Sequence, residues 1–179
     1  MSDQPLWVFG YGSLMWDPGF PVAERQVARL DGYHRSFCMW SIHYRGTREA
    51  PGLVLALDAA PGASCLGLGF RVAPGAEAET LETLRARELI SYAYYEAELP
   101  ITLAGGNRVQ ATTYVVDPKH DQYCGQLTLE EQAAVIARAH GERGPNTDYL
   151  HNTVAHLSEL GIDDPDLAWL NARVRRLAT

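Results

Sequence analysis

Short apolar runs separated by glycine and proline fill the first half of the chain, a pattern that predicts β-strands. LWVFGYG at 6–12 is apolar and aromatic, and QVARLDGYHRSFCMWSI at 26–42 surrounds a predicted turn at Asp31-Gly32. GLVLALD at 52–58 reads as a buried strand that ends in a turn over 59–62. In SCLGLGFRV at 64–72, Gly67 and Gly69 predict a bend or a close backbone approach.

The apolar period then changes to that of a helix over 74–90, and returns to strands at 92–103 and 108–117. Ala-Gly-Gly-Asn joins these two strands, which predicts a hairpin. From about residue 128 the chain reads as helical. Thr128 and Glu131 form a capping box for a helix that we expect to stop at Gly141.

Two more helices complete the C-terminal third. Asn146, Thr147 and Asp148 can cap one that runs to Gly161. Asp163, Asp164 and Pro165 can start the last, whose apolar face carries Leu167, Leu170 and Val174. With no repeat and no linker, the pattern predicts one α+β domain over 1–179, a strongly bent sheet or barrel with helices around it.

The first predicted helix has a carboxylate on its apolar side. Glu88 follows Leu81 by seven residues and Leu84 by four, so it falls within the stripe that these leucines form with Ala78. An inward carboxylate is costly unless it is paired or protonated, and burial raises its pKa toward the range useful for proton transfer. Alternatively, Glu88 pairs with Arg85 or Arg87, or lies beyond a frayed helix end.

The glycine-rich segment after the first strand is the second candidate. Gly10 and Gly12 allow positive φ and close approach of a ligand, and successive amides from Tyr11 to Leu14 can form a nest for an anion. Ser13 adds a hydroxyl group. The segment matches neither a P-loop, a dinucleotide fingerprint nor a nucleophile elbow, so an ordinary tight turn stays an alternative.

Composition narrows the class of partner. The 179 residues are 46% hydrophobic and 21% charged, with a formal net charge of −7. This describes a globular chain that can bury roughly 70% of its unfolded surface. Without a basic stripe, nucleic acid is not an expected partner, and no apolar stretch reaches the ~20 residues of a membrane span.

Cysteine and histidine spacing bears on redox compartment and metal binding. Cys38, Cys65 and Cys124 are widely separated, and no signal peptide precedes them, which predicts a reduced, cytoplasmic protein. The six histidines lack zinc spacing, so no metal site is expected. Arg45 lies in a predicted loop and can offer a guanidinium to a carboxylate, or can simply be solvated. Tyr149 is either a core residue or reaches a site.

Four motifs in this order resemble the ChaC-type γ-glutamylcyclotransferases: WVFGYGSLMW, HYRGTREAPGLVLALD, RARELISYAY and GPNTDYL. The resemblance covers about residues 6–170. It implies a small mixed β-barrel flanked by helices, with conversion of glutathione to 5-oxoproline and Cys-Gly and no cofactor. It maps the catalytic glutamate to Glu88, the substrate loop to Gly10 through Leu14, and a further site residue to Tyr149.

One position departs from the family pattern: Tyr92 stands where a small residue is expected, which puts the exact helix exit and the shape of the pocket in doubt. Leu14 after Ser13 is similar to the ChaC branch. The expected mechanism is attack of the substrate's α-amine on its own γ-carbonyl, with Glu88 as base and then acid. Arg45 is a candidate for the glycine carboxylate. Alternatives are other γ-glutamyl substrates, a non-catalytic γ-glutamyl-binding module, and a serine amidohydrolase that uses Ser13.

Overall fold

A computed structural model describes residues 5–89, 93–125 and 127–177. The described residues form two compact units, one from 1–35 and 57–117 and the other from 36–56 and 118–179. Compact units are not by themselves independently folding domains, so the single domain over 1–179 stays a prediction. Strands and helices follow the chain as β1 (Trp7–Gly10), a 3-10 turn η1 (Ser13–Met15), β2 (Val22–Ser41), β3 (Gly52–Val72), α1 (Glu77–Glu88), β4 (Tyr94–Leu103), β5 (Arg108–Val116), α2 (Leu129–Arg138), β6 (His140–Gly141), β7 (Gly144–Pro145), α3 (Asn146–Glu159) and α4 (Pro165–Leu177).

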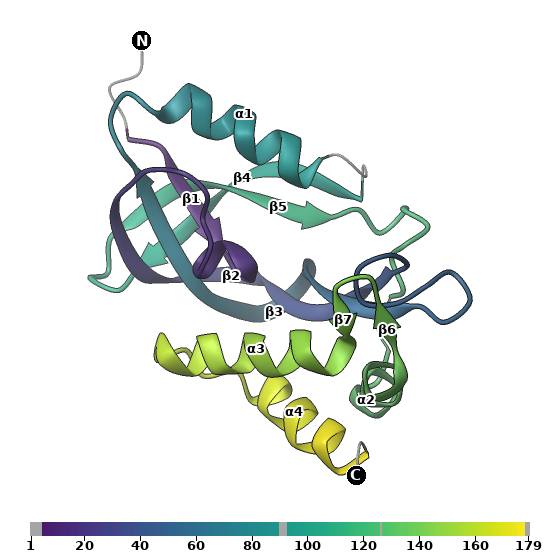
Figure 1. Cartoon of the computed structure of the whole chain (residues 1–179). Coiled ribbons are helices and arrows are strands. Elements are labelled where there is room, and N and C mark those ends of the chain that lie inside the picture. The colour runs from purple at the N-terminus through teal and green to yellow at the C-terminus, as the bar shows by residue number, and fades with distance from the viewer. Residues whose placement is uncertain (1–4, 90–92, 126, 178–179) are drawn as a thin grey trace. The chain divides into compact units, whose positions relative to one another are not determined.

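A closed barrel is the centre of the first unit. Its strands follow the order β1-β3-β2-β4-β5 (Figure 1). β1 pairs antiparallel with β3 and parallel with β5, while β4 pairs antiparallel with β2 and along its length with β5. The β4–β5 hairpin turns at Gly106, with φ of 92°. The sheet is therefore mixed and closed, which confirms the predicted α+β class and small mixed barrel.

Two predicted turns are wrong, because β2 and β3 each continue through them. Gly32 lies within β2 and Gly62 within β3, and both glycines have φ of 85°. A single left-handed glycine can form a bulge, which bends a strand without ending it. The glycine signals were therefore correct about backbone conformation and wrong about chain reversal.

The barrel interior is filled by alternate side chains of its strands, as a period of two dictates. The buried cluster consists of Trp7, Phe9, Ala28, Leu30, Leu57, Cys65, Ile101, Leu103, Ala111 and Val115. Gly67 and Gly69 lie where side chains would not fit, since a Cβ at Gly67 would meet the Gly10 carbonyl oxygen and one at Gly69 would lie 3.0 Å from Leu103. The predicted close approach at these glycines is confirmed.

Helix α1 packs on the barrel beside β4 and β5 (Figure 1). Its inward face carries Thr80 and Leu84, which are buried, and Glu88 follows four residues later. Ala78 is exposed, so its predicted place in the stripe is wrong, while Thr80 replaces it with a small side chain. This helix presents a narrow apolar face, and Glu88 ends that face.

The second unit contains α2, α3 and α4, which contact one another. The capping box of α2 is confirmed, with Thr128 Oγ1 accepting from the Glu131 amide at 3.1 Å and the Glu131 carboxylate accepting in return. The helix ends at Arg138 rather than Gly141, because the following residues pair as β6 with β7. Within the described ranges, no helix is long and apolar enough to cross a membrane.

The start of α3 differs from its predicted cap. Asn146 lies inside the helix, and Pro145 precedes it without a side-chain cap. The Asn146 side chain instead accepts from the Leu53 amide at 2.8 Å and donates to the Leu53 carbonyl at 2.9 Å. The Asn146 side chain satisfies both its oxygen and its nitrogen with Leu53, which a local capping bond would not do. Helix α4 begins at Pro165 and buries Leu167, Leu170 and Val174, as predicted.

Candidate active site

The glycine-rich segment leaves β1 at Gly10 and forms the short turn η1. Met15 donates its amide to the Gly12 carbonyl at 2.9 Å, and Asp17 donates to Ser13 at 2.8 Å. Since the first amides of any helical turn precede its first internal bond, those of Ser13 and Leu14 are not used by this turn. The segment is thus a turn with internal hydrogen bonds whose leading amides remain for other partners.

The two glycines of this segment do not use positive φ. Gly12 has φ of −137°, and Gly10 is absent from the glycines with positive φ. A Cβ at Gly10 would lie 3.1 Å from the Leu14 Cβ and 3.2 Å from Phe70, whereas one at Gly12 would meet open space. The crowding at Gly10 therefore comes from the protein's own side chains, and the expected close approach of a ligand stays a prediction.

Glu88 is the last residue of α1, and 19% of its side chain is exposed. Loss of water around the carboxylate raises its pKa, and the nearby Arg87 guanidinium partly opposes this rise. The distance from Arg87 Nε to Glu88 Oε1 is 3.7 Å. Both readings of Glu88 offered by the sequence therefore hold in part, because the side chain is largely buried and also lies 3.7 Å from Arg87.

Arg87 joins the two candidate elements. One terminal nitrogen, Nη2, donates to Ser13 Oγ at 3.0 Å, and the other, Nη1, donates to the Asp17 carbonyl at 3.1 Å. The structure therefore brings together the loop and the C-terminal turn of α1. Sequence reasoning found Glu88 and the loop, but treated Arg87 only as a partner for the glutamate.

A second arginine holds the other side of the loop. Arg35, which is 7% exposed, donates through Nη1 to the Tyr11 carbonyl at 2.6 Å and through Nη2 to the Leu66 carbonyl. Charged donors make stronger hydrogen bonds than neutral ones. The predicted site residues did not include Arg35, and its position in a predicted strand close to Phe37 and Trp40 was the one sequence signal of a special role.

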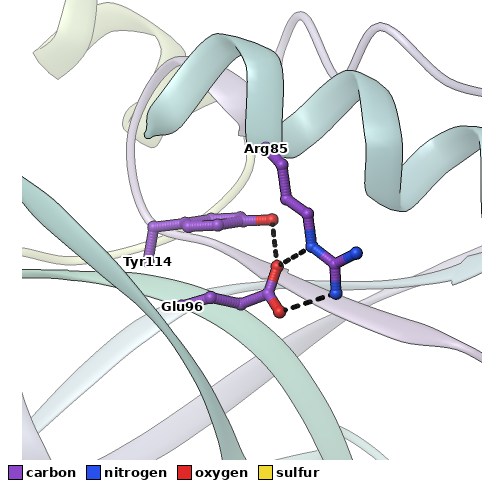
Figure 2. A network of polar contacts seen from close by, with 3 residues as sticks. All are labelled: Arg85, Glu96 and Tyr114. Atoms are coloured by element: carbon purple, nitrogen blue, oxygen red, sulfur yellow. Dashed lines mark hydrogen bonds and ion pairs between the residues drawn. The ribbon is translucent and has the colours of Figure 1, made fainter. Parts of the chain in front are cut away.

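Arg85, the other proposed partner of Glu88, belongs to a separate network (Figure 2). Its Nε and Nη2 donate to the two carboxylate oxygens of Glu96 at 2.9 and 3.0 Å, and Tyr114 donates its hydroxyl to Glu96 Oε1 at 3.0 Å. Arg85 lowers the pKa of Glu96. Burial and the Glu96 contact raise the pKa of Tyr114, and the Glu88 charge adds to that rise. This network fastens the last turn of α1 to β4 and β5.

Two predicted site residues lie in the second unit and contact each other. Arg45 donates through Nη1 to the carbonyls of Arg143 at 2.9 Å and Pro145 at 3.1 Å. Its guanidinium carbon lies 5.7 Å from the centre of the Tyr149 ring. The Tyr149 hydroxyl accepts from the Leu55 amide at 3.2 Å. Arg45 is therefore not simply solvated, and Tyr149 has the satisfied hydroxyl expected of a packed residue.

Two further sequence-based expectations concern Tyr92 and metal binding. Tyr92, the departure from the family pattern, lies outside the described residues. Among the residues that the structure describes, no group of three or more histidine, cysteine or acidic side chains has the geometry to hold a metal ion.

The family comparison adds an independent observation. A family model described as ChaC-like protein matches residues 6–177. This chain belongs to the ChaC-like family. The resemblance predicted from its four motifs is thus confirmed over nearly the whole length.

Curated relatives of this ChaC-like chain carry cyclotransferase names. A protein of Escherichia coli (strain K12) named glutathione-specific gamma-glutamylcyclotransferase is 35% identical over 176 residues, covering 98% of this chain and 75% of that protein. The Arabidopsis thaliana protein named gamma-glutamylcyclotransferase 2-3 is 32% identical over 180 residues, covering 96% and 89%. The family assignment therefore does not rest on one relative.

A solved structure supports the fold of the ChaC-like chain. The crystal structure of a yeast glutathione-specific cyclotransferase superposes with a TM-score of 0.83. It covers 98% of this chain and all of that chain, at 24% identity. At this identity the likeness shows the fold, and the predicted cyclotransferase-type barrel with helices is confirmed.

Proposed function

We propose that this protein is a γ-glutamylcyclotransferase that converts glutathione to 5-oxoproline and Cys-Gly. Relatives with glutathione-specific cyclotransferase names support the reaction class. The observation that carries the proposal is Glu88, a largely buried carboxylate of raised pKa that Arg87 joins to the glycine-rich loop. A single titratable group beside a loop with available amides is what an intramolecular aminolysis needs.

The proposed chemistry forms one bond and breaks one. The α-nitrogen of the γ-glutamyl group bonds to its own γ-carbonyl carbon, and the amide bond from that carbon to the cysteine nitrogen breaks. Glu88 takes a proton from the attacking nitrogen and returns it to the leaving amine. Because both reacting groups belong to one molecule, the protein's main task is to hold the curled substrate. The reaction as proposed uses no cofactor.

The loop from Gly10 to Leu14 is proposed to hold the γ-glutamyl group. The amides of Ser13 and Leu14 lie before the first internal bond of η1, so they can donate to a carboxylate or to the developing oxyanion. A well-placed donor of this kind contributes roughly 3 kcal/mol to transition-state stabilisation. Gly12 is buried, but a Cβ there would meet no atom within 4 Å, which supports space for a substrate group on that side of the loop.

Arg45 and Tyr149 are proposed to bind the remainder of the substrate. The bonds from Arg45 to the Arg143 and Pro145 carbonyls use one of its terminal nitrogens, and a guanidinium has five N–H donors. The others can meet the glycine carboxylate of glutathione as a charge-assisted pair. Tyr149 contributes its ring face, which already stacks against the Arg45 guanidinium. We also propose a cytoplasmic location, in keeping with a small-molecule substrate.

A serine amidohydrolase is less well supported. Ser13 accepts a hydrogen bond from Arg87, and a guanidinium remains protonated at neutral pH. This contact cannot remove the proton of the hydroxyl, as a serine nucleophile requires. Product identity separates the two reactions, because a hydrolase releases glutamate and a cyclotransferase releases 5-oxoproline. A non-catalytic γ-glutamyl-binding module would release neither.

The decisive experiment compares Glu88→Gln with the wild type. The substitution keeps the shape and removes the base, so release of Cys-Gly from glutathione should fall at least ~100-fold while substrate still binds. Glu82→Gln is the matched control, since Glu82 is an exposed glutamate on the same helix. Products are identified by mass spectrometry with glutathione and with several γ-glutamyl amino acids. Near-normal turnover by Glu88→Gln would reject Glu88 as the base.

A further inference from the structure

Arg87 occupies a position that the proposed chemistry does not use, between the loop and the base. Its guanidinium reaches two groups of the loop, the hydroxyl of Ser13 and the carbonyl of Asp17. These partners are 74 and 70 residues away in sequence. The Arg87 side chain is 34% exposed, and that of Glu88 is 19% exposed.

We propose that Arg87 is a positioning residue that holds the substrate loop at a set distance from Glu88. The expected effect of Arg87 on catalysis rests on the proposed function. Its role in holding the loop rests on the observed contacts with Ser13 and Asp17. Arg87 and Glu88 are consecutive in α1, so a loop fastened to one is fastened beside the other. Reactions that depend on a curled substrate conformer lose rate steeply when the base and the binding groups drift apart.

The contact requires arginine rather than any cation. Two donors held in one rigid plane, Nη2 and Nη1, bridge an oxygen on Ser13 and one on Asp17, whereas a lysine ammonium is a point charge on a flexible stem. Lysine can keep the positive charge near Glu88 but loses the pair of hydrogen bonds that the planar guanidinium makes to Ser13 and Asp17. Substitution by lysine and by methionine therefore separates the geometric effect from the charge effect.

The charge effect has a defined sign. Among the described residues, Arg87 from α1 and Tyr114 from β5 interact electrostatically with Glu88, and Tyr114 is in turn bonded to Glu96 on β4. Arg87 lowers the pKa of Glu88 against the rise caused by burial. Removing the guanidinium should move the acid limb of the kcat/KM profile to higher pH, and keeping a cation should leave it in place.

The test combines kinetics with hydrogen exchange. Arg87→Met should lower kcat/KM for glutathione about 10- to 100-fold and shift the acid limb upward. Arg87→Lys should lower kcat/KM about 10-fold with the limb unmoved. In both variants, amide exchange of a peptide covering 10–17 should accelerate, because the bonds from Met15 and Asp17 lose their support.

Two controls keep the result specific. Arg108→Met removes an exposed guanidinium on β5. Arg108 lies six residues before Tyr114 on this strand, about 20 Å away at the usual rise per residue. This variant should change neither kcat/KM nor the amide exchange of 10–17. In a double-mutant cycle, Ser13→Ala should lose most of its effect once Arg87 is already replaced. Thermal melts verify folding, and Arg87→Lys serves if the methionine variant does not fold.

Each outcome decides the inference. Unchanged exchange of 10–17 in both variants would overturn it, and so would a fall in kcat/KM that is fully additive with Ser13→Ala. If the wild type does not turn over glutathione, the proposed function fails. The exchange experiment still decides whether Arg87 holds the loop, so the two failures are distinguishable.

Discussion

The hydroxyl of Tyr114 should contribute measurably to stability, because it is a buried donor to a charged acceptor. Tyr114 is 2% exposed and donates to Glu96 Oε1 at 3.0 Å (Figure 2). Hydrogen bonds to charged groups contribute about 1.5–3 kcal/mol. In Tyr114→Phe the carboxylate keeps both bonds from Arg85 and remains 26% exposed, so we expect the lower end, about 1.5 kcal/mol. For a chain of this length that corresponds to a fall in Tm of about 3–6 °C.

The assay is urea unfolding of the wild type, Tyr114→Phe, Glu96→Gln and the double variant. Arg85 and the Tyr114 bond lower the folded pKa of Glu96, so their stabilisation is present above the ordinary glutamate pKa of about 4.3. It is lost as pH falls through the folded pKa. The difference between wild type and Tyr114→Phe should therefore shrink in acid, and the cycle should show coupling of about 1 kcal/mol at neutral pH.

Tyr95, the neighbour of Glu96 on β4, is 45% exposed, and Tyr95→Phe should change the free energy of unfolding by less than about 0.5 kcal/mol. Additive effects of Tyr114→Phe and Glu96→Gln would refute the reasoning. A Tyr114→Phe effect that is as large in acid as at neutral pH would do the same.

Two further substitutions test packing at the loop and at the start of α3. Gly10→Ala should destabilise the fold by about 1–3 kcal/mol in urea unfolding, because its Cβ would overpack a crowded site, whereas Gly12→Ala enters open space and should cost less than half of that. Asn146→Ala should lower the free energy of unfolding by about 2–4 kcal/mol, because it strands the buried amide and carbonyl of Leu53; an effect below 0.5 kcal/mol would mean that water replaces both bonds.

Local patterns predicted most elements correctly. The hairpin of β4 and β5, the capping box at Thr128, and the buried face of α4 all depend on residues within a few positions of each other. Glu88 could also be placed inward, because its spacing from Leu84 is one helical turn. Errors arose where a local signal had two meanings, as at Gly32 and Gly62, where a glycine of positive φ lies within a continuing strand instead of at a chain reversal.

The sequence by itself determined the order and type of elements, the inward carboxylate and the family, since each follows from periodicity, capping or a local motif. Only the tertiary structure decided which donor meets which acceptor when the two are far apart in the sequence. Asn146 could have capped its helix but bonds to Leu53, and Arg87 could have paired only with Glu88 but also holds Ser13. Such choices depend on chain segments 93 and 74 residues apart being brought together in the fold, and no local pattern encodes them.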